Sequence, residues 1–398
     1  MTCTAGKQQH NISWKMSVSV SPSRRLPVVA FILLIQGPFQ VLSFAPAGCD
    51  APISDSVGRG QQRTRNRLDT TTSCTSALFA EYTATDSVGD GDTGGGIYRP
   101  FAEYAWSRLK DTGLFEDEEA TPGVPKELAS NTSPARGMAE GTDVNIEVRS
   151  MAGKESSSPV RLARYALLET LAPATSANDR VAVPDAIHVL NLVAFPDPNL
   201  TGCSALPVLG LDLVTLPGSK HLLAIDFQPV LPLPVSSSGG DGDDESEEGK
   251  VKRIVLPEQY AEFEHRLADL HRKHCVDSDA LPWGGDIPEF ARRFFSPYAV
   301  WTRLAGEEAL PVVQNEVMSV FCDYVDLYTD LMQRIQRDIN SGSLILDSKN
   351  GNPDAVQGQT DYLNYRRDND PARPMLKSLY GEEWTEKLIA EILFRNIQ

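Results

Sequence analysis

Three polar residues stand inside apolar segments that are otherwise typical of buried strands. They are Asn191 in VLNLV, Asp212 in LGLDLVTL and Asp226 in LLAIDFQP. A buried carboxylate is unfavourable unless it is paired or protonated. A desolvated carboxyl group has a raised pKa and can hold a proton near neutral pH, as a proton donor must. Asp212 is therefore a candidate general acid. The alternative is an aspartate at a strand end that points to water.

The same three residues predict a small-molecule site. If their strands are neighbours, one face of a sheet lines a cavity with a few convergent polar groups, the usual form of a ligand site. We therefore take Asn191 and Asp226 as candidate substrate-binding residues. The amide of Asn191 can donate or accept a hydrogen bond in such a cavity, and a lone structural hydrogen bond is an equally good explanation.

A charged cluster near the C-terminus adds a second candidate acid. The segment 361–376 reads DYLNYRRDNDPARPML, and Pro371 predicts that a helix stops at or before Asp370. On a loop above the sheet face, Asp370 would be a second proton donor. An arginine such as Arg366 would clamp ligand carboxylates through paired hydrogen bonds. The alternative is a network of surface salt bridges.

Other kinds of site are not indicated. The sequence has no phosphate-binding glycine loop, no HExxH and no GxSxG, so no nucleotide cofactor and no metal are predicted. The six cysteines form no CxxC pair. The 398 residues carry a formal charge of -17, which disfavours binding to nucleic acid or to anionic membranes.

The N-terminal segment is typical of a targeting signal. Arg24 and Arg25 precede the apolar run LPVVAFILLIQ at 26–36, and Gly37 and Pro38 then break it. Such a run is too short to span a bilayer as a mature helix, and it predicts a signal peptide over residues 1–43. No later segment reaches the ~18 apolar residues of a membrane helix, so the mature protein is predicted to have no membrane span.

The next segment has the composition of a transit peptide. Residues 51–80 contain Arg59, Arg63, Arg65 and Arg67, with many serines and threonines and few acids. With SFAP at 43–46, the whole N-terminal region resembles the bipartite presequence of algae with complex plastids. We expect a transit peptide and flexible linker over residues 44–95 and a protein of the plastid stroma.

The remaining chain, 96–398, is predicted to form one folded domain. Its strands are predicted at 144–150, 160–171 (in part or whole), 187–195, 206–216 and 220–230, and its helices at 98–110, 258–274, 287–295, 307–339 and 384–397. Residues 236–249 form a predicted disordered acidic insertion. This order predicts the α/β class, as a three-layer α/β/α sandwich around a central, mainly antiparallel sheet.

Several motifs within 144–398 resemble the ferredoxin-dependent bilin reductases. They are DLVTLPG at 212–218, LLAIDFQP at 222–229, FFSP at 294–297, VWTRL at 300–304, DPAR at 370–373 and YGEEWT at 380–385. LPWGGDIP at 281–288 and DYVDLY at 323–328 favour the branch that forms phycoerythrobilin.

The resemblance implies an oxidoreductase acting on CH–CH groups with no bound cofactor, in which reduced ferredoxin supplies single electrons to a bilin and the protein supplies protons. It implies catalytic roles for Asp212 and Asp370 and a substrate-binding role for Arg366. Asn191 stands where the phycocyanobilin-forming branch has a histidine. The expected reaction is therefore reduction of the A-ring diene of 15,16-dihydrobiliverdin to phycoerythrobilin, through bilin radicals.

The resemblance leaves other functions open. They are a phytochromobilin synthase, a reductase that makes 15,16-dihydrobiliverdin from biliverdin, and a non-catalytic bilin carrier. Retention of Asp212 and Asp370 argues against the carrier, which needs no proton donors. The expected partners are ferredoxin, the bilin and an upstream bilin reductase that hands over its product, and the protein is expected to be a monomer.

Overall fold

The structure is a computed structural model that describes residues 96–116, 124–154, 158–173, 181–201, 206–231, 256–346, 352–395 and 397. The predicted signal peptide (1–43), transit peptide and linker (44–95) and acidic insertion (236–249) lie outside these residues. Among the helices described, none combines the length and the apolar character needed to cross a membrane.

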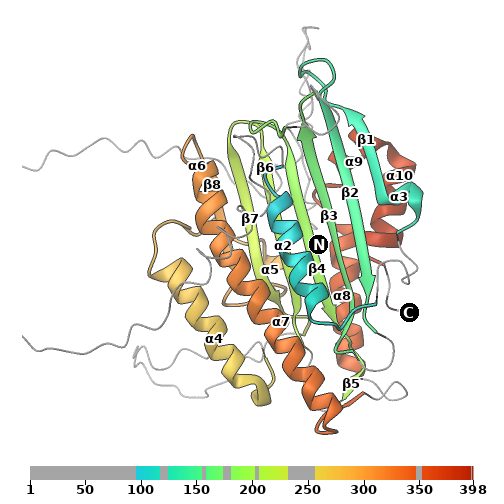
Figure 1. Cartoon of the computed structure of the whole chain (residues 1–398), viewed down its shortest axis with the longest axis vertical. Coiled ribbons are helices and arrows are strands. Elements are labelled where there is room, and N and C mark those ends of the chain that lie inside the picture. Colours follow the sequence, from blue (N-terminus) through green and yellow to red (C-terminus); the bar gives the residue numbers. More distant parts are fainter. Residues whose placement is uncertain are drawn as a thin grey trace, which may run out of the picture. The chain divides into compact units, whose positions relative to one another are not determined.

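A seven-stranded antiparallel sheet forms the centre of the fold (Figure 1), with the strand order β1-β2-β3-β4-β6-β7-β8. The strands are β1 (Ser130–Pro134), β2 (Asp143–Ala152), β3 (Val160–Leu171), β4 (His188–Pro196), β6 (Val208–Leu216), β7 (Lys220–Gln228) and β8 (Val300–Ala305). A separate pair joins β5 (Leu200–Thr201) to β9 (Ile345–Leu346). The five predicted strands are confirmed, and segment 160–171 is one long strand.

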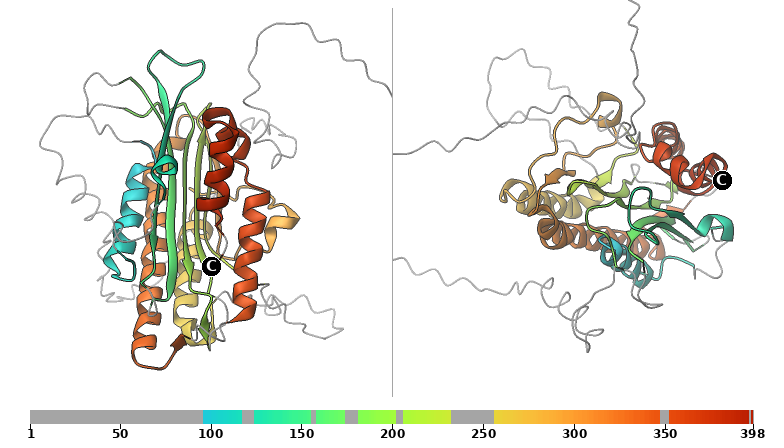
Figure 2. Two further views of the ribbon diagram at one scale, coloured as in Figure 1. Left: turned by 90° about the vertical axis from the view of Figure 1, so that its right-hand side faces the viewer. Right: turned by 90° about the horizontal axis from the view of Figure 1, so that it is seen from above.

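Helices cover both faces of the sheet, as the left view of Figure 2 shows. On one face lie α2 (Arg99–Asp111) and α7 (Met318–Asn340), with α4 (Ala261–His271) packed on α7. On the other lie α8 (Pro353–Asp368), α9 (Arg373–Tyr380), α10 (Glu382–Lys387) and η6 (Leu388–Leu393). The predicted α/β/α sandwich is confirmed.

Short turns of helix connect these elements. They are α3 (Lys126–Ala129), η3 (Glu258–Tyr260), η4 (Arg272–Val276), α5 (Glu289–Arg292), α6 (Ala309–Val312) and η5 (Val313–Val317). The helix expected at 287–295 is therefore a single turn.

Alternation along the strands separates two cores. In β6, Leu209, Leu211 and Leu213 pack into the core beneath α2 and α7. Successive side chains of a strand point to opposite faces, so Gly210 and Asp212 face the helices α8 to α10. Val208, on that same face, joins the second core cluster with residues of α8, α9 and η6. The face that carries Asp212 is therefore the one covered by the C-terminal helices.

Helix α8 was not predicted, although its first residues carry a start signal. Asn352 accepts a hydrogen bond from the amide of Ala355 at 3.2 Å, and Pro353 occupies the first turn. Gly358 allows a close approach to the sheet, because a Cβ there would lie 2.4 Å from the carbonyl oxygen of Val230. Tyr362 then donates to Gln228 of β7 at 2.6 Å. These contacts fix the height of α8 above the sheet.

The end of α8 places an arginine over the sheet. Arg366 and Arg367 lie in its last turn, where cations interact favourably with the helix dipole. The helix gives way at Asn369, whose side chain donates to the carbonyl of Tyr365 at 2.9 Å. The predicted stop before Pro371 is confirmed.

Candidate active site

Three polar side chains form a hydrogen-bonded row across β3, β4 and β6. Arg164 Nη1 donates to Asn191 Oδ1 at 2.8 Å, and Asn191 Nδ2 donates to Asp212 Oδ1. The register explains the row, because Asn191 lies directly opposite Asp212 and Ala166, on the same face of β3 as Arg164, lies opposite Asn191. The amide of Asn191 is therefore held with its oxygen toward the arginine and its nitrogen toward the aspartate.

Arg366 closes the row from the helix side. Its Nη1 lies 3.1 Å from Asp212 Oδ2, and its Nη2 donates to Oδ1 at 3.3 Å. Burial acts to lower the pKa of Arg366, but the adjacent Asp212 carboxylate raises it by more. The pKa of Arg366 therefore lies above its usual value. The Asp212 side chain is 27% exposed. The lone, desolvated carboxyl that the sequence predicted is thus replaced by a partly exposed carboxylate in a two-point ion pair.

Asp370 follows directly beyond α8. Its Oδ1 accepts a hydrogen bond from the amide of Ala372 at 2.9 Å. Burial raises the pKa of Asp370, and the nearby Asp212 charge raises it further, against the opposing effect of Arg366. The folded protein therefore favours the protonated form of Asp370, which is the form that can give up a proton. The structure brings Asp212, Arg366 and Asp370 within electrostatic reach of one another.

Two further residues belong to this group and were not predicted. Arg164 is fully buried, and burial lowers its pKa to about 10. Phe394, which follows η6, places its ring centroid 5.3 Å from Arg164 Cζ and 5.6 Å from Arg366 Cζ. An arginine within the apolar strand VRLARYALL was the available signal for Arg164. No sequence signal pointed to Phe394, because its position depends on how the C-terminal helices pack.

Asp226 does not join the group, and its substrate-binding role stays a prediction. It is fully buried, and its two oxygens accept hydrogen bonds from the amide of Ser296, at 2.8 Å, and from the Ser296 hydroxyl. Burial raises the pKa of Asp226 to about 7. The segment after α5 covers this part of the face, so Asp226 anchors that segment.

The anchored segment supports one side of the site. Phe294, two residues before Ser296, packs against Tyr365 of α8 with 4.8 Å between the ring centroids and 30° between their planes. Its ring also meets Tyr362 edge-on at 5.4 Å. Both tyrosines precede Arg366 on α8. Asp226 therefore contributes to the position of α8 indirectly.

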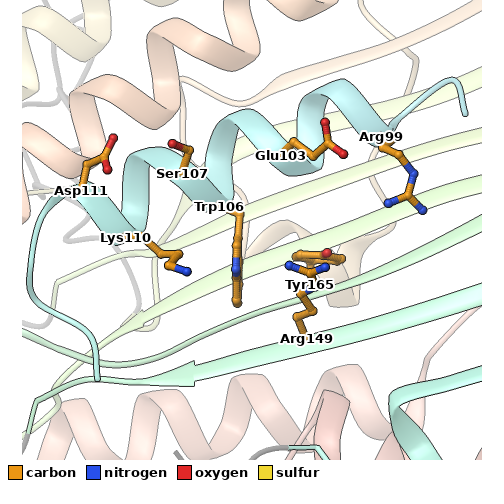
Figure 3. A pocket seen from close by; sticks show the side chains of 8 residues that line it. All are labelled: Arg99, Glu103, Trp106, Ser107, Lys110, Asp111, Arg149 and Tyr165. Carbon is orange, nitrogen blue, oxygen red and sulfur yellow. The ribbon is translucent and has the colours of Figure 1, made fainter. Parts of the chain in front are cut away.

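A cavity of about 340 Å³ lies on the opposite face of the sheet, between α2 and the strands β2 and β3 (Figure 3). Its aromatic residues, Trp106 and Tyr165, meet edge-on at 5.0 Å. Arg99 of its wall is ion-paired with Glu147 and Glu169. The lining residues are Arg99, Glu103, Trp106, Ser107, Lys110, Asp111, Arg149 and Tyr165, and none of them is a predicted site residue. We place the candidate chemistry at Asp212 because the carboxyl groups and the buried cations converge there.

The described residues contain no group of three or more His, Cys, Asp or Glu side chains arranged to hold a metal ion. The polar groups of the site are arginine, asparagine and aspartate, side chains that can form hydrogen bonds to an organic substrate.

Comparison with known proteins places this site in a family. Residues 255–395, which include Arg366, Asp370 and Phe394, match the model of the ferredoxin-dependent bilin reductases. Phycoerythrobilin:ferredoxin oxidoreductase of Prochlorococcus marinus (strain MIT 9211) is 31% identical over 298 residues, 74% of this chain and 94% of that protein. The chain belongs to the ferredoxin-dependent bilin reductases.

Other relatives agree. Phycoerythrobilin:ferredoxin oxidoreductase of Nostoc punctiforme is 37% identical over 210 residues, which cover 53% of this chain and 66% of that protein. The fold matches that of phytochromobilin synthase from tomato, solved in complex with biliverdin, with a TM-score of 0.50 and 22% identity over 75% of this chain and 82% of that one. The predicted class of enzyme is confirmed: a bilin reductase is an oxidoreductase that takes its electrons from ferredoxin.

Proposed function

We propose that this bilin reductase reduces the A-ring diene of 15,16-dihydrobiliverdin to phycoerythrobilin. The observation that carries the proposal is the convergence of Asp212 on the sheet with Arg366 and Asp370 from the C-terminal helices. We take the bilin to bind in a slot between these two acids, one on the sheet and one next to the C-terminal helices, because a flat pigment that must gain two protons suits that arrangement. The names of the relatives support the choice of product.

The balance of the reaction is two electrons and two protons. Two reduced ferredoxins each give one electron and are oxidised, and the bilin passes through a radical intermediate. Each added electron makes the pigment more basic, so a proton can follow. Burial raises the pKa of Asp370, which favours the protonated form that can donate. In this mechanism Asp212 also passes on a proton, once Arg366 has moved away from it.

The remaining groups bind and orient the substrate. Arg366 offers a guanidinium group to an oxygen of the bilin once it leaves Asp212. Asn191 keeps its amide nitrogen toward Asp212 and is not a proton donor. This agrees with reduction at the A ring without the histidine that the phycocyanobilin-forming branch uses.

The test is an anaerobic absorbance time course with the purified protein, reduced ferredoxin and either 15,16-dihydrobiliverdin or biliverdin. We expect 15,16-dihydrobiliverdin to be consumed and phycoerythrobilin to form. Consumption of biliverdin to give 15,16-dihydrobiliverdin or phytochromobilin would assign one of the other two reductases. Binding of both pigments with no reduction of either would indicate the carrier.

We further propose that the protein works as a monomer in the plastid stroma, where it receives its substrate from an upstream bilin reductase. The support for the location is the composition of residues 1–95. Fusion of residues 1–95 to a fluorescent protein tests the targeting, and sedimentation of the mature protein with and without an upstream reductase tests the assembly. Fluorescence outside the plastid would contradict the location.

A further inference from the structure

Arg164 is a buried cation whose hydrogen bonds are incomplete. Its side chain is fully buried, yet only Nη1 has a partner, the amide oxygen of Asn191 at 2.8 Å. Among the described residues, Nε and Nη2 have no hydrogen-bond partner, and no carboxylate forms an ion pair with the group. A buried guanidinium with two unsatisfied donors and no direct ion-pair partner is unfavourable for folding, so its presence calls for an explanation.

The surroundings of Arg164 connect it to the slot between sheet and helix. Asn191 joins it to Asp212, and the charges of Asp212, Asp370 and Arg366 all act on it. The Phe394 ring lies against both Arg164 and Arg366. The donors of a guanidinium point along its plane while its faces stack on aromatic rings. Contact with the Phe394 ring therefore leaves Nε and Nη2 able to donate hydrogen bonds to a ligand.

We infer that Arg164 is a substrate-binding residue, whose Nε and Nη2 donate to an oxygen acceptor of the bilin. A linear tetrapyrrole offers two kinds of acceptor, the propionate carboxylates and the lactam carbonyls. Both present lone pairs to in-plane donors, and the carboxylate would also supply the missing counter-charge. This inference rests on the proposed function and adds to it a second cation, on the sheet side of the slot, opposite Arg366.

The same geometry gives Arg164 an effect on Asn191. Because Nη1 donates to Asn191 Oδ1, the amide cannot turn its oxygen toward Asp212. Binding of the bilin to the two free donors fixes the guanidinium and with it the orientation of Asn191. In this proposal Arg164 binds the substrate and also fixes the orientation of Asn191 beside Asp212, the candidate proton donor.

The test compares Arg164→Met with Arg161→Met, the other arginine of β3. Arg161 is also largely covered, and its Nη2 likewise has no partner among the described residues, but its Nε donates to Gln359 at 3.0 Å and its guanidinium packs on Phe195. The charges that act on it are those of Asp197 and Arg395, not those of the candidate site. Arg164→Met removes the unpaired charge, so we expect it to melt at or above the temperature of the wild type. We expect its Kd for biliverdin, from absorbance titration, to rise about 10- to 100-fold, as for loss of a hydrogen bond to a charged group. Arg161→Met should bind as the wild type does.

Several outcomes decide the matter. Wild-type affinity in Arg164→Met, or an equal loss in Arg161→Met, overturns the inference. If Arg164→Met does not fold, Arg164→Leu, which also lacks the charge and the donors, replaces it, and wild-type affinity of that variant has the same meaning. The wild type tests the proposed function separately. If the wild type binds no bilin, the proposed function itself is wrong. If the wild type and Arg164→Met both bind the bilin tightly, only the role of Arg164 is wrong.

Biliverdin dimethyl ester distinguishes the two acceptors. If the loss caused by Arg164→Met disappears with the ester, the acceptor is a propionate carboxylate. If the same loss persists, the acceptor is a lactam carbonyl. Equal affinities of the wild type and Arg164→Met for the free acid, whatever the ester shows, overturn the assignment.

Discussion

Arg366 and Asp212 are 154 residues apart in the chain and form a two-point ion pair, with 3.1 Å between Nη1 and Oδ2. One comes from the last turn of α8 and the other from the middle of β6. The pair joins the C-terminal helices to the sheet at the place where the bilin is proposed to bind. In the proposed mechanism the pair opens before Asp212 passes on a proton.

Removal of Arg366 should weaken both the fold and the site. Arg366→Met leaves a partly buried Asp212 without its cation, and we expect the free energy of unfolding to fall by about 2 kcal/mol, between the values for exposed and buried pairs. Urea titration measures this change. Arg366→Lys keeps the charge but not the two-point geometry and should lose less stability. Equal losses in the two variants would contradict the importance of the charge.

The two acids should be needed for reduction but not for binding. Asp212→Asn and Asp370→Asn each remove one transferable proton, so we expect reduction of 15,16-dihydrobiliverdin to slow by about 100-fold or more. Bilin titration should show that the pigment is still bound, and anaerobic spectra should show radical or unreduced pigment. Asp368→Asn, in the same segment but exposed, is the control and should keep its rate. Normal turnover by both variants would remove the proposed roles.

The pH dependence of stability should change when Asp226 is neutralised. Its pKa is about 7 in the fold, against about 3.9 in an unfolded chain. A raised carboxyl pKa gives stability that is fully present below about pH 4 and is lost as the pH rises through 7. Relative to the wild type, Asp226→Asn should therefore gain stability between pH 5 and pH 8, by at most about 4 kcal/mol.

Urea denaturation of Asp226→Asn and the wild type at pH 5 and pH 8 gives this difference directly. Effects of all other titrating groups cancel in the comparison. A difference between the two proteins that is the same at both pH values would show that Asp226 keeps an ordinary pKa.

Phe394 should compete with the bilin for the slot. Its ring centroid lies 5.3 Å from Arg164 Cζ, on the sheet, and 5.6 Å from Arg366 Cζ, on the helix. Phe394→Ala should lower the free energy of unfolding by about 3 kcal/mol, as for loss of a buried ring. It should also tighten biliverdin binding, because the pigment no longer displaces the ring. The neighbouring Leu393→Ala is the control for lost packing, and weaker binding by Phe394→Ala alone would mean that the ring stacks on the pigment.

A methyl group at position 358 should lift α8 from the sheet. A Cβ on Gly358 would lie 2.4 Å from the Val230 carbonyl oxygen, so Gly358→Ala forces a backbone shift that costs about 1–3 kcal/mol. The better helix propensity of alanine offsets about 1 kcal/mol. We expect a net loss of stability in urea and a lower reduction rate. Gln357→Ala, on the exposed side of the same helix, should change stability by less than about 0.5 kcal/mol, and a Gly358→Ala protein as stable as this control would contradict the close approach.

Much of the fold could be predicted from local pattern. The strands β4, β6 and β7 are apolar runs separated by turn residues, and they pair in the predicted antiparallel order. The strand β8 and the helix α8 were missed because their sequences are mixed in polarity, and contacts distant in sequence decide their structure. For β8 those contacts are the pairing with β7, and for α8 they are Gly358 against Val230 and Tyr362 on Gln228.

The amino-acid sequence by itself singled out Asp212 and Asp370 as candidate proton donors, because they stand out against apolar or proline-bounded surroundings. Only the tertiary structure decided which polar groups meet. It paired Asp212 with Arg366, placed the unpartnered donors of Arg164 beside Asn191, and enclosed Asp226 beneath Ser296. The physical reason is that burial and hydrogen bonding of a strand residue depend on which segment covers that point of the sheet, and the covering segments here come from distant parts of the chain.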